Sequence, residues 1–322
     1  MDLEMLKKRA AIIRQVRSFF DKKNYLELDT PLLCSDLIPE SCLEVFQTER
    51  IYPRGSKKEN APLYLIPSPE IWMKKIIAQH SVDVYQICKC FRNGESCGHL
   101  HNSEFTMLEY YTIGADYMDS LALTEELFSH LARETQAPAL NPPIKKITVA
   151  EAFKQFAGFD LFACAENKET LEREAKRLGL APMPETTIQQ LYDLIFIHAV
   201  EPCLKTEELT ALVDYPAFVP CLAKKSPDGK TVERWELYYN GIELANCFSE
   251  ETIAEKVKEF FISEEAEKER TALVKHKVDR EYWKLFEHKV EKGFPRCSGV
   301  AMGLDRLIMA ITECSNIDAV IN

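Results

Sequence analysis

Apolar and polar residues alternate along two neighbouring stretches of the chain, which predicts two strands joined by a loop. Residues 82–91 form an apolar run that ends at Phe91 and leads into a loop rich in Gly, Ser and His. A second strand-like stretch follows at residues 104–111. Side chains of a strand point alternately to its two faces. One face of this second strand should therefore carry Phe105, Met107, Glu109 and Tyr111.

That face has two chemically different ends. At ~3.3 Å per residue, Phe105 and Glu109 should lie roughly 13 Å apart. An aromatic ring can stack on a purine, and a carboxylate beside the phenol of Tyr111 can bind an amino group. The two ends of an aminoacyl adenylate could be held in this way. The alternative is an ordinary β-hairpin with charged residues on its solvated face.

The N-terminal stretch predicts an amphipathic helix and a short strand. Apolar residues with a helical period include Leu6, Ile13, Val16 and Phe20. The helix should end near Asn24, and residues 25–28 should form a strand that is closed by Pro31. Residues 48–62 are polar and basic and predict a loop.

Ser68, Pro69 and Glu70 predict the start of another helix. Ser68 can cap it, Pro69 suits its first turn, and Glu70 lies at the favourable end of the helix dipole. Capping is compatible with a second role in binding a ligand.

A helical pattern dominates the middle of the chain. Residues 119–133 predict a helix, and residues 138–143 predict a Pro-rich loop. Further helical segments, punctuated by Gly and Pro, are expected at 148–157, 167–178 and 186–199. We interpret these segments as a helical insertion at about residues 141–210, between two halves of one sheet. Helical stretches at 252–275 and 280–292 come later.

The Asn-Gly dipeptide at 240–241 lies between two strand-like runs and predicts a β-hairpin. A two-residue turn places Tyr238 opposite Glu243 and makes Glu236 a diagonal neighbour of Glu243 on the same face. Two carboxylates on one face repel each other unless they share a cation. Mg²⁺ that also holds the phosphates of ATP would fill this role. Two solvated glutamates on an exposed face are the alternative.

Asn246, Phe248 and Glu250 alternate onto one face of the strand that follows this turn. These three residues are out of phase with Glu243, because a strand has a side-chain period of two. A bulge or twist near Ala245 is therefore required if both sets are to face one pocket.

Residues 297–311 predict a strand that leads through Gly303 into a helix. Gly lets a backbone approach a ligand closely, and a helix start presents N–H groups and positive potential to an anion. Arg306 in the first turn adds bidentate phosphate binding. A strand and helix that simply pack together are the alternative.

Composition and charge narrow the class of protein. Of the 322 residues, 46% are hydrophobic and 28% charged, the profile of a folded globular chain. No apolar run reaches the ~20 residues that cross a bilayer, and the N-terminus lacks a signal-peptide layout, so we expect a cytoplasmic protein. The net charge of −11 disfavours binding of nucleic acid over a broad basic surface. The pairs Lys57-Lys58, Lys145-Lys146 and Lys224-Lys225 are expected to be solvated surface pairs.

The 11 cysteines have no small-scaffold spacing, which predicts reduced thiols, many of them in the core. A zinc site is only weakly indicated, because a C-x-C spacing within a strand does not match the usual ligand spacing. The residues that could form such a site are Cys88, Cys90, Cys97, His99 and His101.

Several of these stretches resemble the motifs of one enzyme family. Phe91-Arg-Asn, a short loop and the run HNSEFTMLEYY resemble motif 2 of class II aminoacyl-tRNA synthetases of the lysyl type. The first helix, strand and Thr-Pro resemble motif 1, the run GIELANCFSE resembles the lysyl-type G-x-E-x-x-N-G-F-x-E, and the Gly303 stretch resembles motif 3. The resemblance implies an α+β fold in which residues 1–322 form one catalytic domain with a mixed or antiparallel sheet flanked by helices. It also implies a homodimer formed through motif 1.

The resemblance implies roles for individual residues. Arg92 and Arg306 would be catalytic by neutralising the phosphates of ATP, and Glu236 and Glu243 would bind Mg²⁺. The implied ATP site comprises Arg92, Asn93, Glu95, His101, Asn102, Phe105, Glu243, Leu244, Gly303 and Arg306. The implied amino-acid site comprises Ser68, Glu70, Glu109, Tyr111, Asn246, Phe248, Glu250 and Ala301.

Within the family, the chain resembles a group of ligases. Lysyl-tRNA synthetases carry an N-terminal anticodon-binding barrel, whereas motif 1 begins within the first thirty residues here. A stand-alone catalytic domain, with Ala301 where those synthetases usually have Gly, resembles the elongation factor P–(R)-β-lysine ligases. These enzymes activate (R)-β-lysine as an adenylate and transfer it to a lysine of elongation factor P. The implied ligands are ATP, Mg²⁺ and (R)-β-lysine or lysine, and elongation factor P rather than tRNA is the implied acceptor.

Some positions depart from the family pattern. The loop between Asn93 and His101 is one residue longer than usual, Cys247 replaces a Gly, and the sequence stops at Asn322, a few residues before the family's Arg-containing tail. A free-standing lysine-activating enzyme that acts on tRNA or a small acceptor, and a non-catalytic regulatory paralogue, are therefore alternative functions.

Overall fold

The computed structural model describes residues 2–53, 59–95, 98–135, 140, 142–287 and 293–321. The chain forms two compact units. Unit 1 comprises Met1–Ala115 and Glu250–Asn322, and unit 2 comprises Asp116–Ser249. Among the described helices none is long and apolar enough to cross a membrane.

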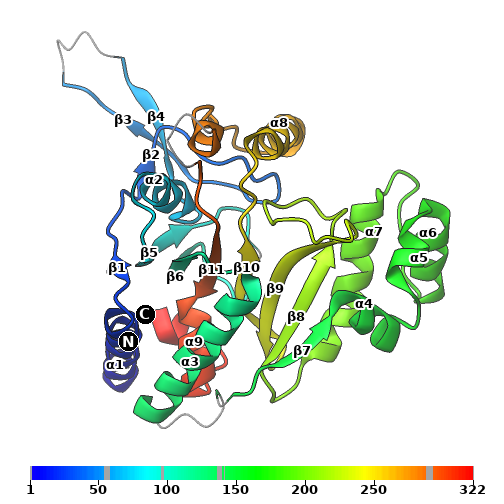
Figure 1. The fold of residues 1–322 in the computed structure, drawn as a ribbon, viewed down its shortest axis with the longest axis horizontal. Coiled ribbons are helices and arrows are strands. Elements are labelled where there is room, and N and C mark those ends of the chain that lie inside the picture. The colour runs from blue at the N-terminus through cyan, green and yellow to red at the C-terminus, as the bar shows by residue number, and fades with distance from the viewer. Residues whose placement is uncertain are drawn as a thin grey trace. The chain divides into compact units, whose positions relative to one another are not determined.

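Unit 1 is built on four strands in the order β1-β5-β6-β11 (Figure 1). They are β1 (Leu26–Glu27), β5 (Val84–Phe91), β6 (Glu104–Ile113) and β11 (Cys297–Gly303). β1 is parallel to β5, and the other neighbouring pairs are antiparallel. The two strands predicted around the Gly/Ser/His loop are therefore confirmed as the antiparallel pair β5–β6.

A second, smaller sheet in unit 1 has the order β2-β4-β3. It consists of β2 (Leu33–Cys34), β3 (Gln47–Arg50) and β4 (Ala61–Leu65), and both pairings are antiparallel. The prediction of a loop over 48–62 is wrong at its two ends, where β3 and β4 pair. All four residues of β3 are exposed, so this strand has no apolar alternation by which it could be recognised. Lys57-Lys58 lies outside the described residues.

Unit 1 also contains five described α-helices. They are α1 (Leu3–Lys22), α2 (Glu70–His80), α8 (Ala254–Thr271), α9 (Leu304–Thr312) and α10 (Asp318–Ile321). Of these, α9 packs on β6 and β11. α1 buries Phe20 against Tyr85 of β5, with ring centroids 4.7 Å apart. Aromatic burial of this kind fixes a helix to its sheet. α1 also packs against α9 and α10, as Figure 1 shows.

Two predictions about helices in unit 1 need correction. The residue before α2 is Pro69, and no side chain caps this helix, so the prediction of a Ser68 cap is wrong. The helix expected at 280–292 is a short 3₁₀ turn at Tyr282–Phe286 in its described part, and residues 288–292 lie outside the described residues. Aromatic packing holds this turn, because the Tyr282 ring stacks on Phe261 of α8 at 4.9 Å.

Unit 2 is built on four strands in the order β10-β9-β8-β7. They are β7 (Lys145–Thr148), β8 (Thr210–Pro216), β9 (Thr231–Tyr239) and β10 (Ile242–Ser249). β7 and β8 are parallel, and the remaining pairs are antiparallel. Helix α3 (Tyr117–Thr135) packs against β9 and β10. Each unit therefore has a mixed sheet with helices, which confirms the α+β class.

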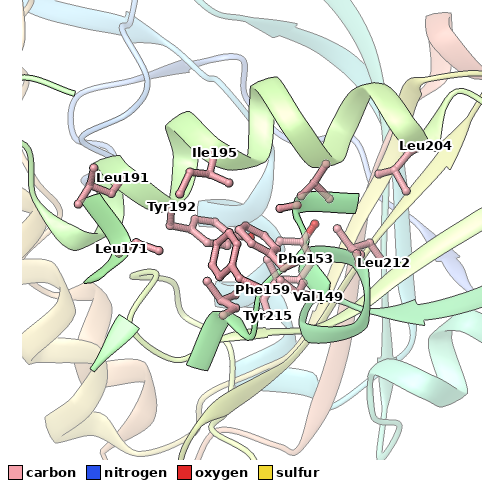
Figure 2. Close-up of a cluster of buried hydrophobic side chains, with 14 of the residues drawn as sticks. Val149, Phe153, Phe159, Leu171, Leu191, Tyr192, Ile195, Leu204, Leu212 and Tyr215 are labelled. Carbon is pink, nitrogen blue, oxygen red and sulfur yellow. The ribbon is translucent and has the colours of Figure 1, made fainter. Parts of the chain in front are cut away.

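A helical connection joins the parallel strands β7 and β8, as parallel pairing requires. It contains α4 (Val149–Ala152), α5 (Leu161–Ala165), α6 (Lys168–Arg177), α7 (Ile188–Ile195), π-helical turns at Phe153–Ala157 and Phe196–Val200, and a 3₁₀ turn at Glu201–Leu204. Figure 2 shows the apolar cluster that these helices form with β8. At its centre Phe153 stacks on Tyr192, with ring centroids 5.3 Å apart. The three helical segments expected at 148–199 are confirmed, while the preceding strand β7 was not predicted.

Candidate active site

The predicted face of β6 is confirmed by the strand register in unit 1. β5 places Gln86 opposite Glu109, and β11 places Ala301 opposite Glu109 and Gly299 opposite Tyr111. Directly opposed residues point to the same face of a sheet. Ala301 therefore lies beside Glu109 on the predicted amino-acid face.

A cluster of three acidic residues, of which Glu109 and Glu250 are buried and Glu70 is half-buried, forms around Lys74 in unit 1. We define this acidic cluster as Glu70, Lys74, Glu109, Tyr111 and Glu250. Lys74 of α2 donates hydrogen bonds to Glu70 Oε1 at 2.5 Å and to Glu250 Oε2 at 2.6 Å. Tyr111 donates its hydroxyl proton to Glu109 Oε1 at 2.7 Å, and the Lys74 ammonium lies 5.9 Å from the centre of the Tyr111 ring.

Two carboxylate oxygens of this acidic cluster are buried and have no hydrogen-bond partner among the described residues. They are Glu109 Oε2 and Glu250 Oε1. Leaving a buried acceptor unsatisfied costs about 1–3 kcal/mol, and more for a charged group. Two half-satisfied carboxylates close to a fixed lysine therefore form a site that suits a ligand with ammonium or other N–H donors.

Burial also controls the protonation of the acidic cluster. Burial, followed by the nearby charge of Glu70, raises the pKa of Glu109 well above its usual range. Burial raises the pKa of Glu250 to about 7, although Lys74 opposes the change. Burial alone would lower the pKa of Lys74, but Glu250 and Glu70 raise it well above its usual value. At neutral pH, Lys74 is therefore charged, while burial favours the protonated forms of Glu109 and Glu250.

The charge of Glu70 in the acidic cluster also acts on Glu40. Burial and the charge of Glu70 raise the pKa of Glu40 to about 7, although the charge of Arg92 opposes this rise. Its segment is held to α8, because Lys268 donates hydrogen bonds to the backbone oxygens of Glu40 at 2.9 Å and Leu43 at 2.5 Å. Neither Glu40 nor Lys74 was predicted as a site residue.

Glycine at position 299 makes room for the Tyr111 side chain. A Cβ atom at Gly299 would lie 2.4 Å from Cε1 of Tyr111. The tyrosine ring can therefore cross β11 and reach Glu109 only because residue 299 has no side chain. Ser68 is half-buried two residues before α2.

Basic and aromatic residues of unit 1 lie at the other end of the β6 face. The Arg92 guanidinium is 5.2 Å from the centre of the Phe105 ring, and its buried Nε has no hydrogen-bond partner among the described residues. Arg306, in the first turn of α9, donates from Nε to the Leu100 backbone oxygen at 3.2 Å. Burial, followed by the charge of Arg306, lowers the pKa of His101. These groups suit an anionic ligand with an aromatic ring.

Two other predicted ATP-site residues of unit 1 contact distant parts of the chain as well as their neighbours. Asn93 donates to the Val45 backbone oxygen at 3.5 Å, and Asn102 donates to Asp318 Oδ1 at 3.3 Å. Asn93 accepts from Gly94 N at 3.0 Å, and Asn102 accepts from Glu104 N at 3.1 Å. Glu95 is half-buried, and its charge opposes the lowering of the His101 pKa. Gly303 is the last residue of β11 and immediately precedes α9.

An unpredicted contact fixes the start of α9. Asp305 is buried and accepts hydrogen bonds from Arg9 Nη1 at 2.5 Å and from Thr106 N at 2.6 Å. Arg9 of α1 also donates to Thr106 Oγ1 at 2.8 Å. The carboxylate beside Arg306 therefore links α9 to α1 and β6 and is not available to a ligand.

The hairpin of unit 2 has the predicted register. Tyr238 lies opposite Glu243, and Glu236 lies opposite Asn246. The register shifts between Glu243 and Ala245, which confirms the predicted bulge and places Leu244 within it. Glu243 and the pair Asn246 and Phe248 therefore point to one face.

Cys247 lies opposite Trp235 on the other face of β10 and is fully buried. Its φ is not positive, so the backbone at this position does not require glycine. The ten cysteines among the described residues form no disulfide bond, and Cys97 lies outside those residues. The sulfur atoms of Cys88 and Cys90 are 3.8 Å apart.

Arg234 organises the predicted metal-binding side of this hairpin. It donates to Glu236 Oε1 at 2.5 Å and to Asn246 Oδ1 at 3.1 Å, while Tyr238 donates to Glu236 Oε2 at 2.7 Å. The Arg234 guanidinium also lies 4.6 Å from the centre of the Tyr215 ring. Glu236 is thus held in one orientation by two donors. Arg234 was not predicted, although its position two residues before Glu236 places both side chains on one strand face.

Glu236 and Glu243 of this hairpin could supply some, but not all, of the oxygen ligands of a shared divalent cation. A carboxylate oxygen can accept more than one contact, so Glu236 keeps coordinating capacity beside its hydrogen bonds. In the described part of the chain, no three His, Cys, Asp or Glu side chains form a group that could hold a metal by themselves. Glu236 and Glu243 would therefore bind Mg²⁺ only together with oxygens from another ligand, such as phosphates.

The chain is similar to known proteins over nearly its whole length. The family of class II tRNA synthetases (D, K and N) matches residues 2–322. The elongation factor P–(R)-β-lysine ligase of Vibrio atlanticus is 34% identical over 322 residues, covering 99% of this chain and 94% of that protein. Proteins of the same name from Vibrio cholerae and Haemophilus influenzae are 35% and 34% identical, covering 99% and 100% of this chain and 94% and 95% of their own lengths. The chain therefore belongs to the class II (D, K and N) tRNA synthetase family.

Proposed function

We propose that this protein is an ATP-dependent ligase that activates (R)-β-lysine or lysine as an aminoacyl adenylate and transfers it to a lysine of elongation factor P. The names of its relatives support the acceptor and the amino acid. The observation that carries the proposal for this chain is the acidic cluster, whose unsatisfied oxygens of Glu109 and Glu250 suit the ammonium groups of a diamino acid.

Residues of the β6 face and of the hairpin would hold the amino acid. Glu70 would bind the amino group near the carboxylate, while Glu250 and Glu109 with Tyr111 would bind the distal ammonium. Ser68, Asn246, Phe248 and Ala301 would shape the remaining walls. Lysine and (R)-β-lysine share the distal ammonium and differ in the position of the other amino group.

Arg92 and Arg306 would bind ATP through its phosphates, with Phe105 stacked on the adenine. Asn93, Glu95, His101, Asn102, Leu244 and Gly303 would complete the nucleotide site. Glu236 and Glu243 would hold Mg²⁺, which supplies charge neutralisation to the phosphates when bound. The family uses ATP, and both arginines offer the bidentate donors that phosphates require.

The proposed reaction has two steps. A carboxylate oxygen of the amino acid attacks the α-phosphorus of ATP, and the bond to the bridging oxygen breaks to release pyrophosphate. The neutral amine of the acceptor lysine then attacks the adenylate carbonyl, AMP leaves, and the amine loses a proton to water. No protein nucleophile is required, because Arg92 and Arg306 would neutralise the charge that develops on the phosphates.

We further propose a homodimer formed through the motif 1 region, α1 and β1, and a cytoplasmic location, where translation takes place. All 322 residues would act as one catalytic domain in which residues 141–210 are a helical insertion. tRNA is not the proposed acceptor.

The direct test is amino-acid-dependent exchange between ATP and labelled pyrophosphate. Exchange with (R)-β-lysine above lysine, followed by a mass increase of purified elongation factor P, is the expected result. Exchange with lysine alone, and transfer to tRNA or a small amine, would instead identify a free-standing lysine-activating enzyme. A folded protein that gives no exchange with any amino acid would leave the non-catalytic alternative.

A further inference from the structure

Lys74 is a buried cation to which the proposed reaction gives no role. Its side chain is fully buried, and its ammonium bridges Glu70 and Glu250 at 2.5 and 2.6 Å. A lysine is almost never fully buried unless it is paired, and here it contacts two carboxylates of the proposed amino-acid site. It therefore acts on the groups that would bind the substrate.

Lys74 determines which oxygens face a ligand. It binds Oε2 of Glu250, and Oε1 of the same carboxylate is left without a partner among the described residues. Tyr111 has the same effect on Glu109, where it binds Oε1 and leaves Oε2. Each carboxylate is thus held by one internal donor and offers one oxygen to a ligand.

Lys74 also controls the charge of the site. Lys74 pairs with Glu70 and Glu250, and its charge also opposes the rise in the pKa of the buried Glu109. Without a fixed cation, a carboxylate that must accept an ammonium would more often carry a proton. A protonated carboxyl group cannot form an ion pair with a ligand.

We propose that Lys74 is a specificity-determining positioning residue, which orients Glu70 and Glu250 so that the pocket selects an amino acid with a side-chain ammonium. This inference rests on the proposed function. An amino acid with a neutral side chain would leave Glu109 Oε2 and Glu250 Oε1 buried without a donor, which is costly.

Binding of the amino acid should depend on pH, because Glu250 must be ionised to form an ion pair with the ligand. The titratable and charged groups around Glu250 are Lys74 and Glu70 of α2, Tyr111 of β6, Tyr282 of the 3₁₀ turn and Cys297 of β11. Burial raises the pKa of Glu250 to about 7, and Lys74 opposes that rise. The KM for the amino acid should therefore fall as the pH rises through about 7, and loss of Lys74 should move this fall to higher pH.

The test compares Lys74→Met with Lys75→Met in the exchange assay between pH 6 and 9. Lys75 is the next residue of α2, but it pairs with Asp279 at 2.6 Å outside the acidic cluster. Lys74→Met should raise the KM for lysine about ten- to a hundredfold, leave the KM for ATP unchanged, and move the pH dependence upward. Lys75→Met should keep both KM values within about twofold of the original protein.

Control measurements separate the possible failures. Circular dichroism and thermal unfolding establish that each variant folds. If Lys74→Met does not fold, the double variant Lys74→Met/Glu70→Gln, compared with Glu70→Gln alone, removes the cation together with one counter-charge and isolates the same effect. A folded Lys74 variant with an unchanged KM and pH dependence would overturn this inference alone. Absence of amino-acid-dependent exchange in the unchanged protein would instead overturn the proposed function.

Discussion

Gly299 and Tyr111 face each other across the β11–β6 pair, and a methyl group at position 299 would overlap the tyrosine ring, 2.4 Å from Cε1. The hydrogen bond from Tyr111 to Glu109 therefore depends on the absence of a side chain on the neighbouring strand. This relationship links the backbone of β11 directly to the acidic cluster.

Gly299→Ala should displace the Tyr111 ring and break its hydrogen bond to Glu109. We expect a loss of about 1–3 kcal/mol in the free energy of unfolding and a KM for the amino acid that rises about tenfold. Gly98→Ala is the control for stability, because an added Cβ there meets no atom within 4 Å. Unchanged unfolding and kinetics in Gly299→Ala would show that the Tyr111 position does not matter.

Glu109→Gln should stabilise the ligand-free protein and abolish activation of the amino acid. Burial raises the pKa of Glu109 above its usual range, so the folded state binds a proton that the unfolded state releases. Stability linked to Glu109 is therefore fully present below the unfolded pKa of about 4.3 and is lost as the pH rises towards the folded pKa. The variant should gain about 0.5–2 kcal/mol relative to the original protein, more at pH 8 than at pH 5.

Denaturant unfolding at several pH values would measure this gain. Glu104→Gln is the matched control on the same strand, because Glu104 is exposed and pairs only loosely with Lys89, at 3.4 Å. A gain that is equal at pH 5 and pH 8 would rule out an unfavourable charge at Glu109.

Arg234→Met should destabilise the protein by about 2–4 kcal/mol, because it leaves Glu236 without its charged partner and Asn246 without a donor. Lys224→Met removes a largely exposed partner of Glu233 and should change the stability by less than about 0.5 kcal/mol. Chemical unfolding of both variants provides the comparison. Equal, small effects would mean that Arg234 contributes no more than a surface charge.

Glu243→Gln should raise the Mg²⁺ concentration that gives half-maximal pyrophosphate exchange by at least about tenfold. The KM for the amino acid should change little, because Glu243 is not part of the acidic cluster. Glu233→Gln, on the preceding strand, is the control. Removal of the metal with EDTA should stop exchange in every variant, and exchange that persists in EDTA would contradict a metal requirement.

The hairpin of unit 2 could be predicted because its determinants are local. An Asn-Gly turn fixes the register, and a bulge near Ala245 was expected if Glu243 and Asn246 were to face one pocket; the register shifts between Glu243 and Ala245. The face of β6 followed from alternation in the same way.

Features that depend on distant contacts were missed. The i, i+4 spacing of Glu70 and Lys74 was available in the sequence, but burial of the lysine depends on Glu250, far along the chain. The small sheet was missed because β3 is exposed on every residue. A helix was expected where Tyr282 instead forms a 3₁₀ turn, because helical periodicity does not distinguish the two over a few residues.

The hydrogen bond between Arg9 and Asp305 connects α1 to the first turn of α9. Arg9 holds the first turn of α9, from which Arg306 would reach the phosphates. If α1 also forms the proposed subunit interface, association of two chains and binding of nucleotide become linked equilibria. The apparent affinity for ATP would then increase with protein concentration, because each association event would stabilise the helix start that the nucleotide requires.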